Sequence, residues 1–241
     1  MPENSPSPVS APNPRLYSHR NLRRYRRLVV GLSHRFAWKV DNTEIADLYA
    51  HHTAASHLEV GPADGHFLVN SPDPVGPDGV PLSARLRQVH LLDLNSAPLV
   101  RCARLLRERA RVLTHQHDVL ACPWPLADDS VGSVAMFHVL HCVPGASLRA
   151  KHTPFSEVAR VLAPSGVFIG STLLGVEDPF TRNNWLARRL QHAYNRPDRN
   201  VFHNDGDRLV ELKHMLGLHF TEVQVTLMGA AGVWVAKGPR R

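Results

Sequence analysis

Short apolar segments alternate with helical patterns along most of the chain, which predicts a parallel β-sheet with crossover helices. In such a sheet the carboxyl ends of the strands meet at one edge, where small molecules bind. Side chains at those ends are therefore the first candidates for function. The predicted strands cover five segments: His57–Val60, Val89–Asp93, Arg111–Thr114, Val131–Phe137 and Gly166–Thr172.

The end of the chain has a different pattern. Two alternating segments, Glu222–Leu227 and Val233–Lys237, are joined by Met-Gly-Ala-Ala-Gly, which is too short to contain a helix. They predict a hairpin, so that one strand enters the sheet antiparallel. Residues 175–205 form a long insertion after the fifth strand, at the place expected for a substrate cap.

The region before the first strand is polar and then helical. Residues 1–15 contain five prolines among polar residues and are expected to be a disordered tail. From Ser18 to about His52 the apolar spacing predicts helices, the second from Asn42 to Tyr49 with Asp41 or Asn42 as its N-cap. We expect residues 16–55 to form a helical lid over the ligand crevice.

Length and composition fit one domain. The chain has 241 residues, of which 43% are hydrophobic, enough for a full core, and we expect a single domain over residues 16–238. No apolar segment approaches the ~20 residues of a membrane helix, and the amino terminus lacks a signal-peptide core, which favours a cytoplasmic location. Three cysteines, Cys102, Cys122 and Cys142, have no disulfide or zinc spacing and are read as reduced core residues.

The formal charge of +7 admits a nucleic-acid partner. The densest basic cluster lies in the first helical pattern, and two interpretations remain open: a solvated helix face, or a surface for RNA or an anionic substrate. The cluster consists of Arg20, Arg23, Arg24, Arg26 and Arg27.

The segment from His57 to Gly65 carries the strongest functional signal. An apolar strand contains Glu59 near its end and then turns through Gly61 and Gly65, as needed where a ligand approaches the backbone closely. A carboxylate there repels a pyrophosphate and attracts an ammonium or a sulfonium. This favours S-adenosylmethionine over a dinucleotide.

Two aspartates follow the next strands. Asp93 ends the second strand, where a carboxylate can accept both ribose hydroxyls of an adenosine, although the Pro/Gly-rich loop places it farther from the glycines than the usual roughly 20 residues. Asp118 follows the third strand and is either a ligand of the adenine edge or a turn cap. Asp128 and Asp129 are expected to begin a turn.

Two histidines follow the fourth strand. His138 and His141 lie at the expected crevice edge, where an imidazole can take a proton near neutral pH, and His141 is the preferred base. The other histidines lack carboxylate or cysteine companions at metal spacing, so no metal site is predicted.

The order of these motifs resembles the class I S-adenosylmethionine-dependent methyltransferases over residues 56–238. The resemblance rests on Leu-Glu-Val-Gly-Pro-Ala-Asp-Gly, Leu-Leu-Asp-Leu-Asn, His-Asp-Val and Val-Ala-Arg-Val-Leu-Ala-Pro-Ser-Gly, with the terminal hairpin. Leu140-His-Cys-Val-Pro-Gly145, Tyr194-Asn195 and Phe202-His-Asn204 are similar to a microbial small-molecule branch tied to secondary metabolism. The resemblance implies an α/β, Rossmann-like fold. Its sheet would have seven mostly parallel strands, with helices on both faces.

The resemblance also implies roles for individual residues. Ala63 departs from the pattern, because the family usually has glycine there. The methionine part of the cofactor would lie against Glu59, Gly61, Ala63 and Gly65, the ribose against Asp93 and the adenine against Asp118. Pro62, Leu94, Val119 and His138 are expected as further cofactor-binding residues.

Methyl transfer to a small-molecule acceptor is therefore the expected function, with His141 and His138 as bases. Trp185, Tyr194 and Phe202 are expected to wall an aromatic or apolar substrate. An RNA methyltransferase and a non-catalytic protein with this fold are the alternatives, and a nicotinamide dehydrogenase ranks last because the turn is not G-x-G-x-x-G. No membrane partner is expected, and a homodimer is left open.

Overall fold

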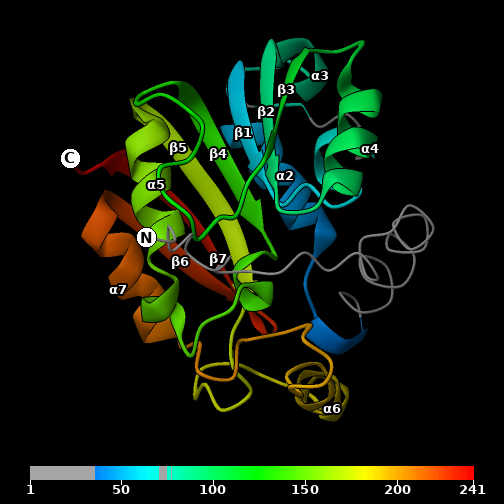
Figure 1. Ribbon diagram of the computed structural model, residues 1–241, viewed down its shortest axis with the longest axis vertical. Helices are drawn as coiled ribbons and strands as arrows, with labels where there is room; N and C mark the ends of the chain where they lie inside the picture. The colour runs from blue at the N-terminus through cyan, green and yellow to red at the C-terminus, as the bar shows by residue number, and fades with distance from the viewer. Residues whose placement is uncertain (1–35, 71–74, 77) are drawn as a thin grey trace, which may run out of the picture.

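The computed structural model describes residues 36–70, 75, 76 and 78–241, and they form a seven-stranded sheet in the order β3-β2-β1-β4-β5-β7-β6 (Figure 1). The strands are β1 (Ser56–Val60), β2 (Gln88–Asp93), β3 (Arg111–Gln116), β4 (Val131–Phe137), β5 (Leu162–Leu173), β6 (Phe220–Met228) and β7 (Ala231–Pro239). All seven predicted strands are confirmed.

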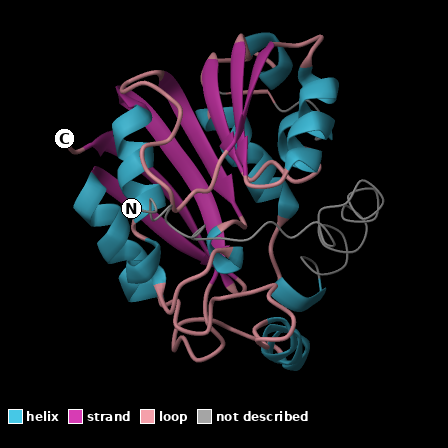
Figure 2. Cartoon of the chain, viewed as in Figure 1, coloured by secondary structure: helices cyan, strands magenta, loops and turns pink. Residues whose placement is uncertain are grey.

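Helices cover both faces of the sheet, with α5 and α7 on one side and α2 and α4 on the other (Figures 1 and 2). The helices are α2 (Asn42–His52), α3 (Leu82–Arg85), α4 (Ser96–Leu106), α5 (Thr153–Val161), α6 (Trp185–Tyr194) and α7 (Leu209–His219), with short helical turns η2 (His66–Asn70), η3 (Leu140–Cys142) and η4 (Leu148–Lys151). The predicted helix at Asn42 is confirmed: Asp41 is its N-cap and accepts a hydrogen bond from the Thr43 backbone N–H at 2.7 Å.

Alternation along the strands divides the core into two apolar clusters. Leu58, Met136 and Phe168 point to the α5 and α7 side, where they pack with Trp234. Other strand residues point to the opposite side, toward α2 and α4. They are Leu91, Ala135, Phe137, Ile169 and Leu173. This is the burial pattern expected for parallel strands covered on both faces.

The register brings the carboxyl ends of five strands to one edge. β1 pairs parallel with β2 and β4, β2 with β3, and β4 with β5. β7 enters antiparallel between β5 and β6, as the terminal hairpin predicts. The 175–205 insertion follows β5 and contains α6, which lies beyond the carboxyl edge of the sheet (Figure 1).

Some boundaries differ from the predictions. β5 begins at Leu162 rather than Gly166, because a register shift between Val131 and Ser133 lets Ala-Pro-Ser-Gly join the strand. After Gly65 the chain forms only the five-residue η2, which is a π-helix. The tail, the first predicted helix up to residue 35 and its arginine cluster lie outside the described residues. Among the residues described, no helix has both the length and the apolar character that a bilayer span requires.

The three cysteines do not share one environment. Cys102 is buried in α4, as predicted, and Cys142 is partly buried. Cys122 is exposed, so its assignment to the core is wrong. It lies in the connection between β3 and β4, which contains no helix.

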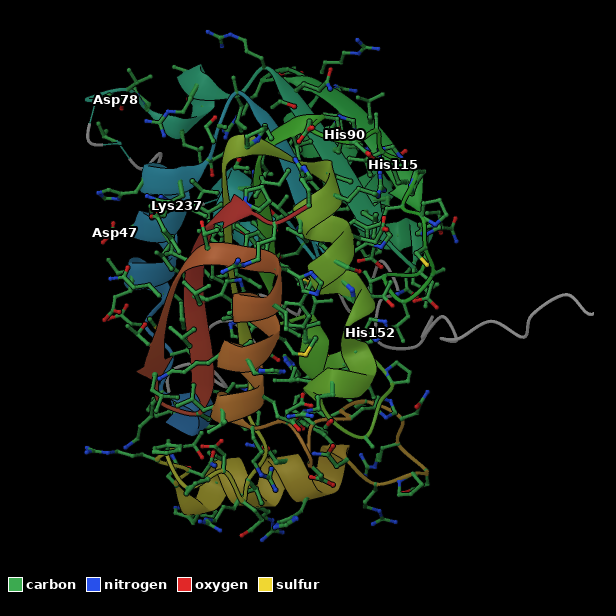
Figure 3. The ribbon with its side chains drawn as sticks, turned by 90° about the vertical axis from the view of Figure 1, so that its left-hand side faces the viewer. Asp47, Asp78, His90, His115, His152 and Lys237 are labelled. Atoms are coloured by element: carbon green, nitrogen blue, oxygen red, sulfur yellow. The ribbon has the colours of Figure 1, made fainter. Side chains whose placement is uncertain are left out.

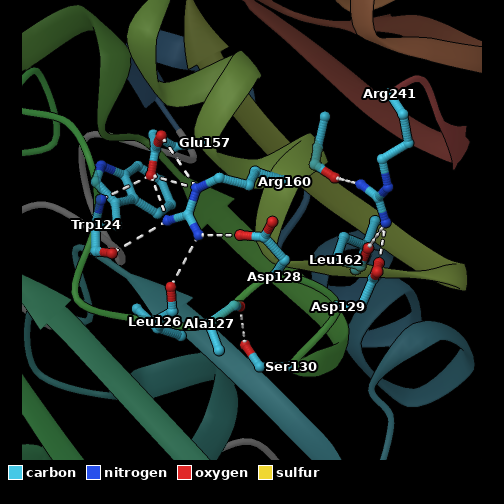
Figure 4. Close-up of polar contacts among 11 residues, drawn as sticks. Trp124, Leu126, Ala127, Asp128, Asp129, Ser130, Glu157, Arg160, Leu162 and Arg241 are labelled. Atoms are coloured by element: carbon cyan, nitrogen blue, oxygen red, sulfur yellow. Dashed lines mark hydrogen bonds and ion pairs between the residues drawn. The ribbon is translucent and has the colours of Figure 1, made fainter.

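Arg160 joins α5 to the loop before β4 (Figure 4). Its guanidinium forms an ion pair with Glu157 and another with Asp128, each at 2.6 Å, and donates to the carbonyls of Trp124 and Leu126. Asp129 is paired with Arg241. The two aspartates therefore fix this loop, which agrees with their predicted role in a turn.

Replacing Arg160 by Met should lower the free energy of unfolding by about 2 kcal/mol, because the Glu157 carboxylate and two carbonyls lose their donor. Urea denaturation measures the change. Arg188→Met is the matched control: its ion pair with Glu177 is exposed on both sides, so we expect a change within about 0.5 kcal/mol. Equal effects of the two substitutions would contradict this role of Arg160.

Candidate active site

The turn after β1 depends on residues with positive φ. Gly61, Ala63 and Gly65 have φ of 68°, 48° and 75°. The Gly61 N–H donates to the Leu92 carbonyl of β2 at 2.8 Å, and a Cβ at position 61 would collide with the Val139 side chain. Gly61 is therefore required both for the conformation and for the close approach of β4's end.

Ala63 is held in the left-handed region, which glycine adopts without strain. An L side chain in this region costs on the order of 1 kcal/mol. The turn keeps its shape despite this cost, because the Gly65 N–H closes it onto the Pro62 carbonyl at 2.8 Å.

Glu59 is a buried carboxylate held by hydrogen bonds. Its side chain accepts from the Tyr49 hydroxyl at 2.7 Å, and its second oxygen lies 3.2 Å from His57 Nε2. Within the residues that the structure describes, Glu59 forms an ion pair with His57 and none with a lysine or arginine. His57 is a cation only when it is protonated. A buried carboxylate without a permanent cation is costly. This site therefore favours a cationic ligand.

A pocket opens directly over the turn and Glu59. Its space, including the part open to solvent, is about 450 Å³. Aromatic side chains form one wall, with Tyr49 and Phe137 rings 5.1 Å apart and Tyr49 and Phe67 rings 5.9 Å apart. The lining residues include Gly61, Pro62, Ala63, Gly65 and His138. Five of the predicted cofactor residues thus meet Glu59 in one cavity.

Asp93 lies at the end of β2 but does not line this pocket. Its Oδ1 accepts from the Asn95 backbone N–H at 2.7 Å and from Asn95 Nδ2 at 3.2 Å, and Leu94 lies between the two residues. Burial raises the pKa of Asp93 to about 6, although the bonds from Asn95 oppose this shift.

Asp118 caps a turn after β3. Its Oδ1 accepts from the Leu120 backbone N–H at 2.9 Å, which is the turn-capping alternative of the sequence. Val119 is buried, and its carbonyl accepts from Trp124 Nε1 at 3.2 Å. A contact of Asp118 or Val119 with adenine stays a prediction.

His138 and His141 occupy different environments. His138 lines the pocket, has φ of 57°, and its backbone N–H donates to the Ser171 carbonyl at 2.8 Å. Backbone strain of this kind clusters at functional sites. His141 is buried, does not line the pocket, and packs edge-on against Phe202 with ring centroids 4.6 Å apart. The geometry thus favours His138 over His141 as the base.

The predicted substrate residues separate into two groups. Phe202 packs against Tyr194 at 5.0 Å between ring centroids and against Trp38 at 6.0 Å. Trp185, at the start of α6, is 73% exposed and lies outside this apolar cluster. Trp38 belongs to the segment predicted as a lid, but its packing on Phe202, 164 positions later, left no local signal in the sequence.

Buried polar residues fix the insertion to the sheet. Asn204 Nδ2 donates to the carbonyls of Leu173 and Leu174 at the end of β5, each at 3.2 Å, and also contacts Gln191 of α6. Lys151 is fully buried and pairs with Asp207 at 2.8 Å. Asn204 thus ties the segment around Phe202 to the end of β5, and Asp207 ties the following residues to η4.

The outer strands hold a second pair of histidines (Figure 3). His90 Nδ1 and His115 Nε2 are 2.9 Å apart with their rings stacked, so one imidazole donates to the other. Burial lowers the pKa of His90 to about 4. In the described part of the chain, no three His, Cys, Asp or Glu side chains gather as a metal site.

Comparison with known proteins agrees with this architecture. The sequence family described as "Methyltransferase domain" matches residues 77–170. Demethylluteothin O-methyltransferase of Streptomyces thioluteus is 32% identical over 83% of this chain and 80% of its own length. The chain belongs to the S-adenosylmethionine-dependent methyltransferases.

Other similar proteins extend the comparison. The N-methyltransferase vrtF of Penicillium aethiopicum is 30% identical to this methyltransferase over 84% of the chain and 78% of the relative. The solved structure of the N-methyltransferase NodS from Bradyrhizobium japonicum with S-adenosylhomocysteine has a TM-score of 0.53 at 12% identity, covering 81% of this chain and 83% of that one. The latter likeness shows the shared fold.

S-adenosylmethionine is the methyl donor of this enzyme. The residues of the site fit it, because a buried carboxylate without a lysine or arginine partner in the described chain lies below a pinched turn. The missed members of the site are Tyr49 and His57, which hold that carboxylate. The position of His57 two residues before Glu59, on the same face of β1, was a signal available in the sequence.

Proposed function

We propose that this methyltransferase methylates a hydroxyl oxygen of a small, largely apolar secondary metabolite. The observation that carries the proposal is the pocket in which Glu59 and His138 both take part, a carboxylate for a cationic donor and an imidazole for a protonated acceptor. Demethylluteothin O-methyltransferase is named for methylation of oxygen and N-methyltransferase vrtF for methylation of nitrogen. In the present enzyme, His138 favours oxygen as the acceptor atom.

In this proposal the cofactor's methionine part lies against Gly61, Pro62, Ala63 and Gly65, with its ammonium facing Glu59. Asp93 and Leu94 hold the ribose, and Asp118 and Val119 the adenine. The sulfonium supplies an activated methyl group for in-line displacement. The protein then has to orient the acceptor, exclude water and remove the hydroxyl proton, and positioning contributes about 7–11 kcal/mol in favourable cases.

His138 takes the acceptor's proton, while Phe202, Tyr194 and Trp38 provide an apolar surface near the sheet edge. His141 packs edge-on against the ring of Phe202 and helps to hold it in place. Trp185 at the outer surface of α6 can reach only the outer part of a large acceptor. A cytoplasmic location and a homodimer stay predictions.

Asp93 gives a pH-dependent test of the ribose contact. Its pKa of about 6 in the free protein means that the carboxyl is largely protonated below that pH, whereas the ionised form is the one that accepts two hydroxyls. Affinity for S-adenosylmethionine should therefore fall by up to about tenfold per pH unit as pH decreases below 6. Calorimetric titrations of the wild type and Asp93→Asn isolate this effect, and the variant should lose it. An unchanged pH profile in Asp93→Asn would remove Asp93 from the ribose site.

The proposed reaction is tested with radiolabelled S-adenosylmethionine and two matched panels of acceptors, phenols and arylamines of similar size. We expect label in the phenols, as methyl ethers. Label only in the amines would overturn oxygen methylation. Transfer to RNA alone would overturn the small-molecule acceptor.

A further inference from the structure

Three polar side chains are buried together beneath the pocket. His57 and Glu59 lie on the same face of β1, and Ser133 of β4 is in register with His57. His57 and Ser133 are fully buried, and neither lines the pocket. A histidine in the interior of a central strand needs hydrogen bonds to offset its burial.

For a neutral His57 beside an ionised Glu59, the carboxylate can only accept, and this sets the direction of each bond. The Ala54 backbone N–H donates to Ser133 Oγ at 2.8 Å, which leaves the serine O–H free to donate to His57 Nδ1, also at 2.8 Å. Nε2 of a neutral His57 then carries the hydrogen and donates to Glu59 Oε2 at 3.2 Å. The Tyr49 hydroxyl donates to the other carboxylate oxygen.

With an ionised Glu59 and a neutral His57, each donor of Tyr49, His57 and Ser133 in this group has an acceptor. Tyr49 of α2 holds one oxygen of Glu59. His57 of β1, which is hydrogen-bonded to Ser133 of β4, holds the other. The carboxylate plane is thereby fixed at the pocket floor, with lone pairs remaining toward the pocket.

We propose that His57, oriented by Ser133, is a positioning residue that holds the Glu59 carboxylate toward the cationic end of S-adenosylmethionine. The inference rests on the proposed contact between Glu59 and the cofactor. It assigns to His57 and Ser133 a contribution to cofactor affinity although neither contacts the cofactor.

Two substitutions of His57 separate this role from simple packing. The amide nitrogen of Gln can replace Nε2 and keep the donor to Glu59, whereas that of Asn replaces Nδ1 and keeps only the contact with Ser133. Both place an amide in the same buried position. His57→Asn should weaken S-adenosylmethionine binding by about tenfold, and His57→Gln by less than about threefold.

The measurements are calorimetric titration with S-adenosylmethionine, and KM for the cofactor and kcat for each variant. We expect KM to follow the affinity loss in His57→Asn, with kcat at saturating cofactor nearly unchanged. Equal binding by the Asn and Gln variants would overturn the inference, as would a loss of kcat alone. If either variant does not fold, Ser133→Ala decides: an unchanged affinity overturns the inference, and a loss of about threefold to tenfold supports it.

Failure of the underlying assignment gives a different result. If Glu59 does not face the cofactor, substitution of Glu59 itself leaves the affinity unchanged, and the inference falls with the proposed function. If Glu59→Gln weakens binding but the His57 variants do not differ, only the positioning role is overturned.

Discussion

Glu59→Gln should lower the affinity for S-adenosylmethionine by about 100-fold. This is the largest effect on cofactor binding that we expect from replacing a single side chain. The change keeps the shape of the side chain and its bond from Tyr49, but removes the charge opposite the ammonium. Losing one member of a buried charge pair costs about 2–5 kcal/mol, and a 100-fold loss of affinity lies within this range of free energies. Calorimetric titration measures the affinity directly.

Glu44→Gln is the matched control, because Glu44 lies on α2 with Tyr49 but is exposed and outside the pocket. It should bind S-adenosylmethionine as the wild type does. Thermal unfolding of both variants without ligand checks that the fold is kept. If Glu59→Gln bound the cofactor with wild-type affinity, the carboxylate would have only a structural role with Tyr49 and His57.

His138→Ala should lower kcat for a phenol acceptor by about 10²–10⁴, the range for a lost general base. Cofactor affinity should change little, because the backbone of the turn and Glu59 are untouched. His192→Ala is the control, an exposed histidine on α6. Raising the pH should partly restore the variant, because the phenol then ionises without help.

The same assay separates the two histidines of the crevice edge. His141→Asn should affect kcat less than His138→Ala, because His141 is buried under Phe202 rather than lining the pocket. A larger loss in His141→Asn would reinstate the base preferred from the sequence. Full activity of both variants would mean that methyl transfer here needs no histidine base.

The sheet could be predicted because strand patterns are local. Each parallel strand carries a short apolar segment, and the hairpin shows alternation with a short connection. The end of β5 was predicted to within one residue, but its start was not, because the extension to Leu162 depends on a register shift against β4. Contacts between strands leave no mark in either segment alone.

The same distinction applies to the site. Glu59, Gly61 and Gly65 were found because one short segment carries both the charge and the bend. Tyr49 was missed as their partner, because α2 reaches Glu59 only after the chain folds back. Trp185 was chosen as an aromatic residue in the cap, whereas its exposure depends on which face of α6 turns to the sheet. That face is set by Asn204 and Gln191, which belong to different segments.

A crystal structure of this enzyme with S-adenosylhomocysteine would show where the charged end of the cofactor lies. We expect the homocysteine part over the turn from Gly61 to Gly65, with its ammonium within about 3.2 Å of a Glu59 oxygen. An ammonium held elsewhere, with Glu59 bonded only to Tyr49 and His57, would disprove the proposed role of Glu59.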